Sequence, residues 1–356
     1  MIVDIPAPDA ADAAPRATLS VVLCTFDGAP WLPEFLRSLA EQTRPPDELI
    51  VQDDASGDAT VELVEAFARD AAFPVRLEVN PTTIGSTSNF ELALKRSTGQ
   101  IVALADQDDI WYPEKLDRLA EALEEDPILT LAFSDADLVD EDGRPLGASL
   151  WDRRGIGRLL RGHEIVPGSY FARRALTTGC TMAARRRAVD AALPFPASID
   201  DAHTPMRHDR WLSLVAASVG TVRALPEHLL AFRVHRSQQT GVLTPQQFRS
   251  RLLAAAADVL GPDAGDRSEE HRCRAEQLGA AADRADRLGD FEEADRLRRV
   301  AEHHRMRADL GPTRRARASR VCKEVADGGY DLSLLGLASV AADSARALRA
   351  GPRRGS

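Results

Sequence analysis

Four short apolar segments, separated by stretches with helical spacing, constrain the fold of this chain more than any other feature. They are Leu19 to Thr25, Glu48 to Gln52, Val75 to Val79 and Ile101 to Ala105. A continuous apolar run of this length is typical of a strand that is buried on both faces. Strands that alternate with helices through short links predict an α/β fold, in which helices cover both faces of a mainly parallel sheet.

Polar residues follow three of these segments. Thr25 to Asp27 end the first, Asp53 and Asp54 follow the second, and Asp106 to Asp109 follow the fourth. In an open α/β sheet, ligands bind at the edge formed by the carboxyl ends of the strands. Neither GxGxxG nor GxxxxGK[ST] follows a predicted strand, which argues against a dinucleotide fold and a P-loop.

The fourth segment ends in a group of carboxylates and an aromatic residue. Asp106, Asp108 and Asp109 precede Trp111 in the sequence IVALADQDDIW. Burial of unpaired carboxylates is costly, so the group needs water, hydrogen-bond donors or cations. A hard divalent cation prefers such oxygen ligands. The alternative is an acidic loop that leads into a helix beginning at Pro113.

The middle of the chain contains a further strand and a long connection. Leu129 to Phe133 is an apolar strand, and Asp135 and Asp137 follow it before a hairpin turn at residues 140–143. Residues 151–170 are rich in Gly and Arg, and we expect them to form a mobile loop over the site.

A carboxylate lies at the start of the next predicted apolar helix. Asp209 belongs to the sequence RHDRW at residues 207–211. The N-terminal end of a helix favours a negative charge, so Asp209 can cap its own helix. A strand is then expected from Leu229 to Val234, with His235 directly after it.

Both ends of the chain differ in composition from its body. Residues 1–17 are acidic and rich in Pro and Ala, which predicts a disordered tail without a signal peptide. Residues 245–310 predict two or three amphipathic helices, interrupted near residues 289–294, and a last helix is expected after Tyr330. Basic residues gather between Arg305 and Lys323, either as a solvated face or as a surface for anionic lipid or a lipid-linked phosphate.

Charge and cysteine content restrict the class of protein. The formal net charge of the 356 residues is −10, and no basic stripe marks the body as a nucleic-acid binder. The four cysteines are far apart and form no CxxC pair, which predicts reduced thiols in a cytosolic protein. No apolar run approaches the ~18 residues that a membrane span needs.

Seven segments, in this order, resemble those of the family 2 inverting glycosyltransferases of the GT-A fold, especially their bacterial rhamnosyltransferase-type branch. They cover about residues 18–242, and any one of them alone would be a weak signal. The segments are SVVLCTFDGAPWLPEFLRSLAEQT, ELIVQDDASGDAT, IGSTSNFELALKRSTGQIVALADQDDIWYPEKL, FSDADLVDEDG, TTGCTMAARR, HDRWLSLVAASVG and FRVHRSQQTG.

The resemblance implies a nucleotide site at the ends of the first two strands. Thr25, Phe26 and Asp27 match the place where the family's first strand meets the nucleotide, and Phe26 lacks the hydroxyl of the usual Tyr. Asp53 and Asp54 match the residues that contact the base and the ribose, with a turn and helix cap as the alternative. A carboxylate can accept from a pyrimidine N–H, which favours uracil or thymine.

The resemblance also implies a divalent cation, Mn²⁺ or Mg²⁺. Asp106 and Asp108 match the DxD-type motif, with Asp108 as a metal ligand and Asp106 near the ribose or the metal. Asp109 would face the donor sugar. Arg233 and His235 match a late loop that closes on the diphosphate and the metal, and a loop histidine bonded to backbone is the alternative for His235.

Asp209 matches the position of the catalytic base. The implied activity is that of a hexosyltransferase of class EC 2.4, which moves a sugar from a UDP- or dTDP-sugar to a hydroxyl of a glycan or lipid-linked acceptor in cell-surface polysaccharide synthesis. Rhamnose is the sugar that the branch suggests. Asp135 and Asp137 are alternative sugar-binding residues.

These observations predict three parts of the chain. A disordered tail spans residues 1–17, a GT-A catalytic domain of Rossmann-like type spans residues 18–243, and a helical extension spans residues 244–356. The extension is expected to contact the membrane, the acceptor or a second copy of the chain, at the cytoplasmic face of the cell membrane. Two alternatives remain: a non-catalytic nucleotide-sugar-binding scaffold that acts through the helical tail, and a DxD-type phosphatase, which needs a nucleophilic Asp after its first strand.

Overall fold

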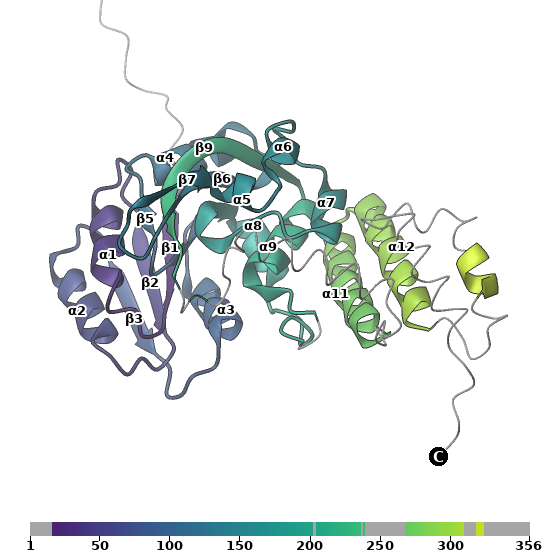
Figure 1. Cartoon of the computed structure of the whole chain (residues 1–356), viewed down its shortest axis with the longest axis horizontal. Coiled ribbons are helices and arrows are strands. Elements are labelled where there is room, and N and C mark those ends of the chain that lie inside the picture. Colours follow the sequence, from purple (N-terminus) through teal and green to yellow (C-terminus); the bar gives the residue numbers. More distant parts are fainter. Residues whose placement is uncertain (1–15, 202–203, 236–237, 239–267, 310–317, 324–356) are drawn as a thin grey trace, which may run out of the picture.

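The computed structural model describes residues 16–201, 204–235, 238, 268–309 and 318–323 (Figure 1). Most of the predicted disordered tail, residues 310–317 of the predicted basic segment and the whole of the predicted last helix therefore lie outside the described residues. The strands are β1 (Leu19–Thr25), β2 (Glu48–Asp53), β3 (Val75–Val79), β4 (Ile101–Asp106), β5 (Ile110–Trp111), β6 (Leu129–Val139), β7 (Pro145–Ser149), β8 (Met182–Arg185) and β9 (Thr221–Arg233).

The helices lie between these strands and after them. They are α1 (Leu32–Ala40), α2 (Thr60–Asp70), α3 (Ser86–Arg96), α4 (Lys115–Glu125), α5 (Leu150–Arg153), α6 (Gly157–Leu160), α7 (Gly168–Arg173), α8 (Arg186–Ala192), α9 (Arg207–Ser218), α11 (Ser268–Arg287) and α12 (Phe291–Ala308), with a 3₁₀ turn, η1, at Gly179–Thr181. None of the helices in the described part is long and apolar enough to span a membrane.

The strands form a single curled sheet with the order β3-β2-β1-β4-β8-β6-β9-β5, and β7 pairs with β6. β1, β2, β3 and β4 run parallel, whereas β8 is antiparallel to both of its neighbours. The register pairs Thr25 with Asp53 and Cys24 with Asp106. The predicted mainly parallel sheet is confirmed, and its register brings the polar strand ends side by side.

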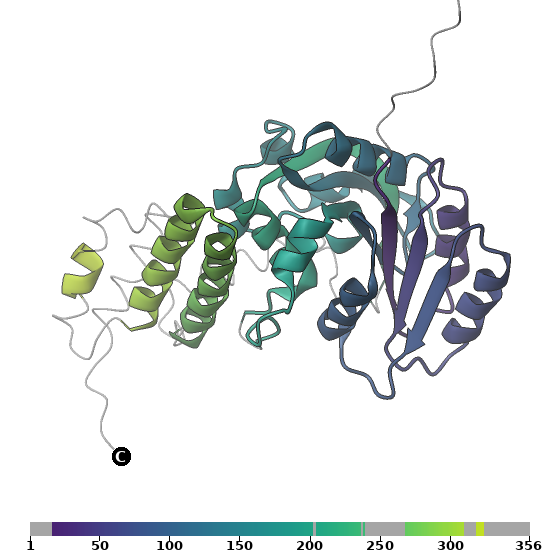
Figure 2. The ribbon, with the colours of Figure 1, turned by 180° about the vertical axis from the view of Figure 1, so that it is seen from behind.

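Helices cover both faces of the sheet and create two apolar layers. One layer joins the sheet to α1 and α4, with Phe35, Leu39, Leu116 and Leu119 fully buried. The other joins it to α3, α8 and α9 and continues into α11 and α12. Figures 1 and 2 show α11 and α12 side by side next to α9, at the end of the molecule remote from β3.

Two predictions about single segments need correction. Residues 151–170 are not a mobile loop, because α5, α6 and the start of α7 lie there and bury the side chains of Trp151, Leu160 and Phe171. β9 begins at Thr221, eight residues before the predicted strand. The predicted interruption of the helical extension is confirmed, since α11 and α12 meet at a turn over residues 288–290.

Candidate active site at the carboxyl ends of the strands

Asp53 joins the ends of β1 and β2. Its carboxylate is fully buried and accepts hydrogen bonds from the Thr25 hydroxyl at 2.8 Å and from the Ser56 hydroxyl and amide at 2.6 and 2.8 Å. A buried carboxylate needs such donors to offset its lost hydration. The side chain therefore holds the turn after β2 against the end of β1.

Asp54, the next residue, orders a different loop. Its carboxylate accepts hydrogen bonds from Asn80 Nδ2 at 2.9 Å and from the backbone amides of Ile84 and Gly85 at 2.8 and 2.9 Å. The Gly85 backbone has a φ of 87°, a conformation that glycine adopts without a steric penalty. The loop after β3 is thus fixed at the same edge of the sheet.

Gln107, which the sequence analysis did not single out, connects β4 to the residues that follow β1. Its Oε1 accepts from the Phe26 amide at 2.9 Å, and its Nε2 donates to the Phe26 carbonyl at 2.8 Å. A Cβ atom on Gly28 would lie 2.2 Å from Gln107 Oε1, so this contact requires glycine there. In the sequence, only the position of Gln107 between two aspartates indicated that it belongs to the site. The Phe26 ring itself is 45% exposed.

Asp27 closes the turn between these segments. Its carboxylate accepts from the Gly57 amide at 2.8 Å, and its own amide donates to Ser56 Oγ at 3.0 Å. The Asp27 backbone has a φ of 44°, which is uncommon for a residue other than glycine and is concentrated at functional sites. The turns after β1 and β2 therefore support each other in one arrangement.

The acidic segment after β4 concentrates negative charge. Burial and the charges of Asp108 and Asp209 raise the pKa of Asp106 to about 7. Burial and the charges of Asp108 and Asp106 raise the pKa of Asp109 well above its ordinary value. Asp109 Oδ2 is buried and has no hydrogen-bond partner within the described ranges. A cation near these carboxylates would relieve both their repulsion and the unpaired oxygen.

A buried lysine lies beneath this segment. Lys115 is fully buried, its ammonium lies 3.9 Å from the centre of the Trp111 ring, and Nζ donates to the carbonyl of Cys180. Burial lowers the pKa of Lys115 to about 8, although nearby groups, including Asp109 and Asp106, favour its charged form. Lys115 was not predicted as a site residue; its position shortly after the acidic segment was the only indication in the sequence.

The ligand atoms of Asp106, Asp109 and Cys180 lie within 4.8 Å of one another and could hold a metal ion. Burial raises the pKa of the Cys180 thiol well above its ordinary value, so the sulfur stays protonated. A neutral thiol is a poor ligand for Mg²⁺ or Mn²⁺, which prefer oxygen. The two carboxylates are therefore the useful ligands of this group.

The end of β9 contacts the acidic segment from the other side. His235 Nε2 lies 2.8 Å from Asp108 Oδ2, and the imidazole stacks on the Trp31 ring with centroids 4.0 Å apart. The His235 side chain is only 4% exposed. The structure thus brings Asp108 and His235, both predicted metal ligands, into direct contact.

The guanidinium of Arg233 is buried and donates its hydrogen bonds to other groups of the protein. It donates to the Asp108 carbonyl at 2.8 Å, to the Glu141 carbonyl at 2.9 Å and to Glu34 Oε2 at 2.5 Å, and it is 2% exposed. Its backbone amide also donates to Asp109 Oδ1 at 3.1 Å. Arg233 therefore fixes the acidic segment to α1 and to the β6–β7 hairpin.

Asp209 lies in the first turn of α9 and does not cap it. The residue at the N-cap is Met206, without a side-chain hydrogen bond, and Asp209 Oδ1 accepts only from the adjacent Arg210 amide at 2.7 Å among the described groups. A Cβ atom on Gly179 would lie 3.7 Å from Asp209 Cβ. Asp209 lies close enough to the acidic segment for its charge to raise the pKa of Asp106.

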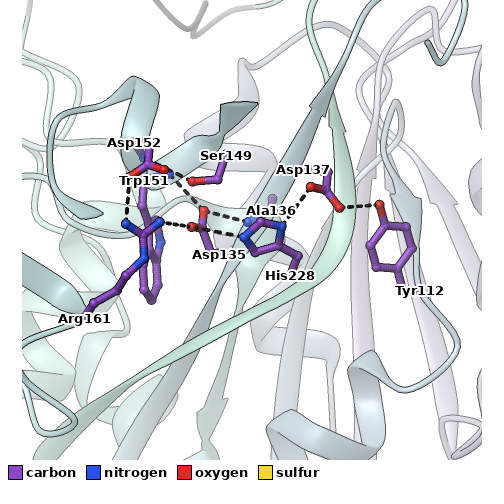
Figure 3. Close-up of polar contacts among 9 residues, drawn as sticks. All are labelled: Tyr112, Asp135, Ala136, Asp137, Ser149, Trp151, Asp152, Arg161 and His228. Carbon is purple, nitrogen blue, oxygen red and sulfur yellow. Dashed lines mark hydrogen bonds and ion pairs between the residues drawn. The ribbon is translucent and has the colours of Figure 1, made fainter. Parts of the chain in front are cut away.

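Asp135 and Asp137 belong to a separate polar network across β6 and β9 (Figure 3). Asp135 is fully buried and accepts from the Ala136 and Trp151 amides at 2.8 and 2.9 Å. His228 Nδ1 lies 2.8 Å from Asp137 Oδ1, and the Tyr112 hydroxyl donates to Asp137 Oδ2 at 2.8 Å. Both carboxylates, which the sequence offered as alternative sugar-binding residues, therefore already contact other protein groups.

Comparison with known proteins places this chain among glycosyltransferase sequences. Residues 20–190 match the family model described as Glycosyl transferase family 2. An uncharacterized protein of Mycobacterium tuberculosis (strain ATCC 25618 / H37Rv) is 28% identical over 225 residues, which cover 61% of this chain and 59% of that protein. The chain thus spans less than two thirds of the length of this relative.

Two further comparisons concern TarS of Staphylococcus aureus, a poly(ribitol-phosphate) beta-N-acetylglucosaminyltransferase. The protein of strain Mu50 is 34% identical over 109 residues, which cover 30% of this chain and 19% of TarS. The crystal structure of TarS residues 1–349 in complex with UDP has a TM-score of 0.50 at 19% identity, and the match covers 88% of this chain and 92% of that chain. The predicted GT-A-type fold with C-terminal helices is confirmed.

Proposed function

Because residues 20–190 match the Glycosyl transferase family 2 model, we propose that the protein transfers a sugar from a nucleoside-diphosphate donor to a hydroxyl of a cell-surface glycan, with inversion. The observation that supports this most is the group of carboxylates after β4, where burial and the charges of Asp108 and of Asp209 on α9 raise the pKa of Asp106. Inverting transfer needs charge neutralisation on one side of the anomeric carbon and a base on the other.

Asp106 and Asp108 are the proposed ligands of a divalent cation, Mn²⁺ or Mg²⁺, with His235 as a third group. The raised pKa of Asp106 and the unpaired Oδ2 of Asp109 indicate an environment that favours added positive charge. The charge of Lys115 offsets only part of the rise in the pKa of Asp106. A cation held by these residues would supply neutralisation of the charge that develops on the departing diphosphate.

Asp209 is the proposed base. Its carboxylate accepts only one hydrogen bond from the described residues, so it keeps the capacity to accept the proton of an acceptor hydroxyl. A carboxylate within hydrogen-bond reach of that hydroxyl removes the proton as the new bond forms. Direct displacement by the acceptor requires no nucleophile from the protein.

The nucleotide is proposed to bind over the ends of β1 and β2. The exposed Phe26 ring offers an apolar face for a base, and Asp27 lies in the adjoining turn. Thr25, Asp53 and Asp54 act in this proposal mainly by holding the loops that meet the nucleotide, since protein donors surround both carboxylates.

The relatives guide the choice of donor and acceptor. TarS acts on poly(ribitol-phosphate) and was solved with UDP, so UDP-sugars are the first donors to test, followed by dTDP-rhamnose. A polyol phosphate or lipid-linked glycan is the proposed acceptor class. Peripheral contact with the membrane and self-association through the helical extension remain predictions of the sequence.

The test is release of nucleoside diphosphate by the purified full-length chain, measured for each donor with Mn²⁺, with Mg²⁺ and with a chelator. We expect metal-dependent release from one pyrimidine nucleotide sugar. Asp108→Ala should abolish it, because the variant removes a proposed metal ligand. Asp142→Ala is the matched control, since Asp142 lies in the exposed β6–β7 turn and pairs with Arg144.

The outcome also separates the enzyme from a scaffold. Release that needs metal and Asp108 supports a transferase. Absence of metal-dependent binding for every pyrimidine nucleotide, measured by calorimetry, would reject the proposed function. A scaffold that acts through α11 and α12 would tolerate Asp108→Ala in cells and fail only when the helical extension is deleted.

A further inference from the structure

Positive charge gathers where the catalytic domain meets the helical extension. Arg210 follows the proposed base on α9, Arg274 lies on α11, and His304 and Arg307 lie on α12. α9 packs directly against α11, as both views of the ribbon show (Figures 1 and 2). His304 on α12 lies against His271 on α11, and burial together with the charges of Arg274, Arg307 and Arg210 lowers the pKa of His304.

Arg210 has hydrogen-bonding capacity that the fold does not use. Its Nε and Nη2 atoms are buried and have no partner within the described part of the chain. Buried donors without partners are rare in folded proteins and call for an explanation. Burial and the charge of Arg274 lower the pKa of Arg210 to about 9, although the charge of Asp209 acts in the opposite direction.

No described carboxylate neutralises the two arginines at contact distance. Neither Arg210 nor Arg274 forms an ion pair with a described Asp or Glu, although Asp209 and Glu270 act on them electrostatically. Other arginines of the same two helices are paired, such as Arg272 with Glu269 and Arg298 with Asp286. Arg210 and Arg274 differ from these arginines because no described carboxylate pairs with them.

The junction is held in place by contacts that do not involve these cations. Gln277 Nε2 donates to the Ser198 and Thr204 carbonyls at 2.8 and 3.0 Å, and Arg284 lies over the Trp211 ring at 5.3 Å. On the far side, His271 Nδ1 lies 3.0 Å from His304 Nδ1, which links α11 to α12. Arg274 lies between these attachments on α11, so its position relative to α9 is fixed in advance.

From this geometry we infer that Arg210 and Arg274 bind a phosphate group of the acceptor substrate. The planar guanidinium group presents paired N–H donors that match phosphate oxygens. A phosphate group has enough oxygens to accept hydrogen bonds from two guanidinium groups that lack a carboxylate partner. Asp209 and Arg210 are consecutive residues in the first turn of α9, so the proposed phosphate site lies at the same end of this helix as the proposed base. The inference rests on the proposed transferase function and specifies its acceptor as a phosphorylated one.

The test uses the full-length chain without donor or metal, so its result is independent of sugar transfer. Binding of inorganic phosphate and of glycerol 1-phosphate is measured by calorimetry, and thermal stability is measured in phosphate and in chloride at matched ionic strength. The variants are Arg210→Gln and Arg274→Gln. Arg272→Gln is the control, because Arg272 lies on the same helix, is exposed and pairs with Glu269.

We expect the wild-type chain and Arg272→Gln to bind both probes and to melt at a higher temperature in phosphate. Each of Arg210→Gln and Arg274→Gln should weaken binding about tenfold or more, the scale of a lost charge-assisted contact. Both variants should fold, because each removes an unpaired charge from a repulsive group. Arg210→Lys should bind at an intermediate level, since it keeps the charge and loses the paired donors.

Three results would overturn the inference. They are no phosphate binding by the wild-type chain, equal binding by all variants, and Arg210-dependent binding to phosphatidylglycerol vesicles without binding of the soluble phosphates. If phosphate binding fails while metal-dependent donor cleavage is intact, only the inference of a phosphorylated acceptor is rejected. If phosphate binds but no donor is cleaved, the proposed transferase function is rejected instead.

Discussion

His235 Nε2 lies 2.8 Å from Asp108 Oδ2, although 127 residues separate the two in the chain. The contact closes the acidic segment after β4 with the residues that follow β9, and Trp31 supports the imidazole by stacking. The site is therefore assembled from the beginning, the middle and the end of the catalytic domain.

His235→Ala should raise the Mn²⁺ concentration needed for half-maximal release of nucleoside diphosphate by about tenfold or more. The imidazole either binds the cation or orients the Asp108 carboxylate, and both roles strengthen cation binding. A Mn²⁺ titration of the activity measures this effect. An unchanged Mn²⁺ dependence would show that the contact only stabilises the fold.

Lys115→Met should lower the free energy of unfolding by about 3–5 kcal/mol, the scale for removal of one partner from a buried charged group. The Cys180 carbonyl loses its donor, and Asp106 and Asp109 lose a compensating charge. Chemical denaturation measures the loss, which should shrink when Mn²⁺ is added.

Lys95→Met provides the comparison for this variant. Lys95 forms an i,i+4 pair with Glu91 on the outer face of α3, and such pairs contribute about 0.5 kcal/mol or less. Equal effects of the two lysine substitutions would contradict a structural role for the buried ammonium.

Gly28→Ala should destabilise the protein by about 1 kcal/mol, because the new methyl group collides with the Gln107 amide and displaces it from its hydrogen bonds with the Phe26 backbone. In a Gln107→Ala background the same substitution should cost much less, since the colliding amide is gone. A double-mutant cycle by chemical denaturation measures this coupling. Additive effects would mean that the Phe26–Gln107 contact does not set the requirement for glycine.

Stability should depend on His304 at acidic pH. Burial and the charges of Arg274, His303, Arg307 and Arg210 lower its pKa to about 3, from an ordinary value of 6.5. Between these values the unfolded chain binds a proton that the folded chain does not, so the free energy of unfolding falls as the pH falls. Denaturation at pH 7 and at pH 4.5 should show a smaller loss for His304→Gln than for the wild type.

Much of the fold was predictable because its first half is locally regular. The predicted ranges of β1 and β3 agree with the structure, and those of β2 and β4 are one residue short. Their register then brings Asp53 and Asp106 to one edge, which follows from parallel pairing alone.

The rest depends on contacts that no local pattern reveals. Within residues 151–170, α5 and α6 have only four residues each. Helices this short show no repeating pattern of apolar residues, so their burial could not be predicted. The contact of Lys115 with Cys180 spans 65 residues. The cationic junction of Arg210 with Arg274 arises only when α11 packs on α9.

The central claim, that Asp209 acts as the base opposite a metal-bound diphosphate, is tested most directly by Asp209→Asn. The amide has nearly the same shape but cannot accept the acceptor proton, so the transfer rate should fall by about 10²–10⁴-fold. Calorimetry of the nucleotide sugar with Mn²⁺ should give the wild-type affinity. A variant that transfers sugar at the wild-type rate, or that loses donor binding together with transfer, would contradict this assignment.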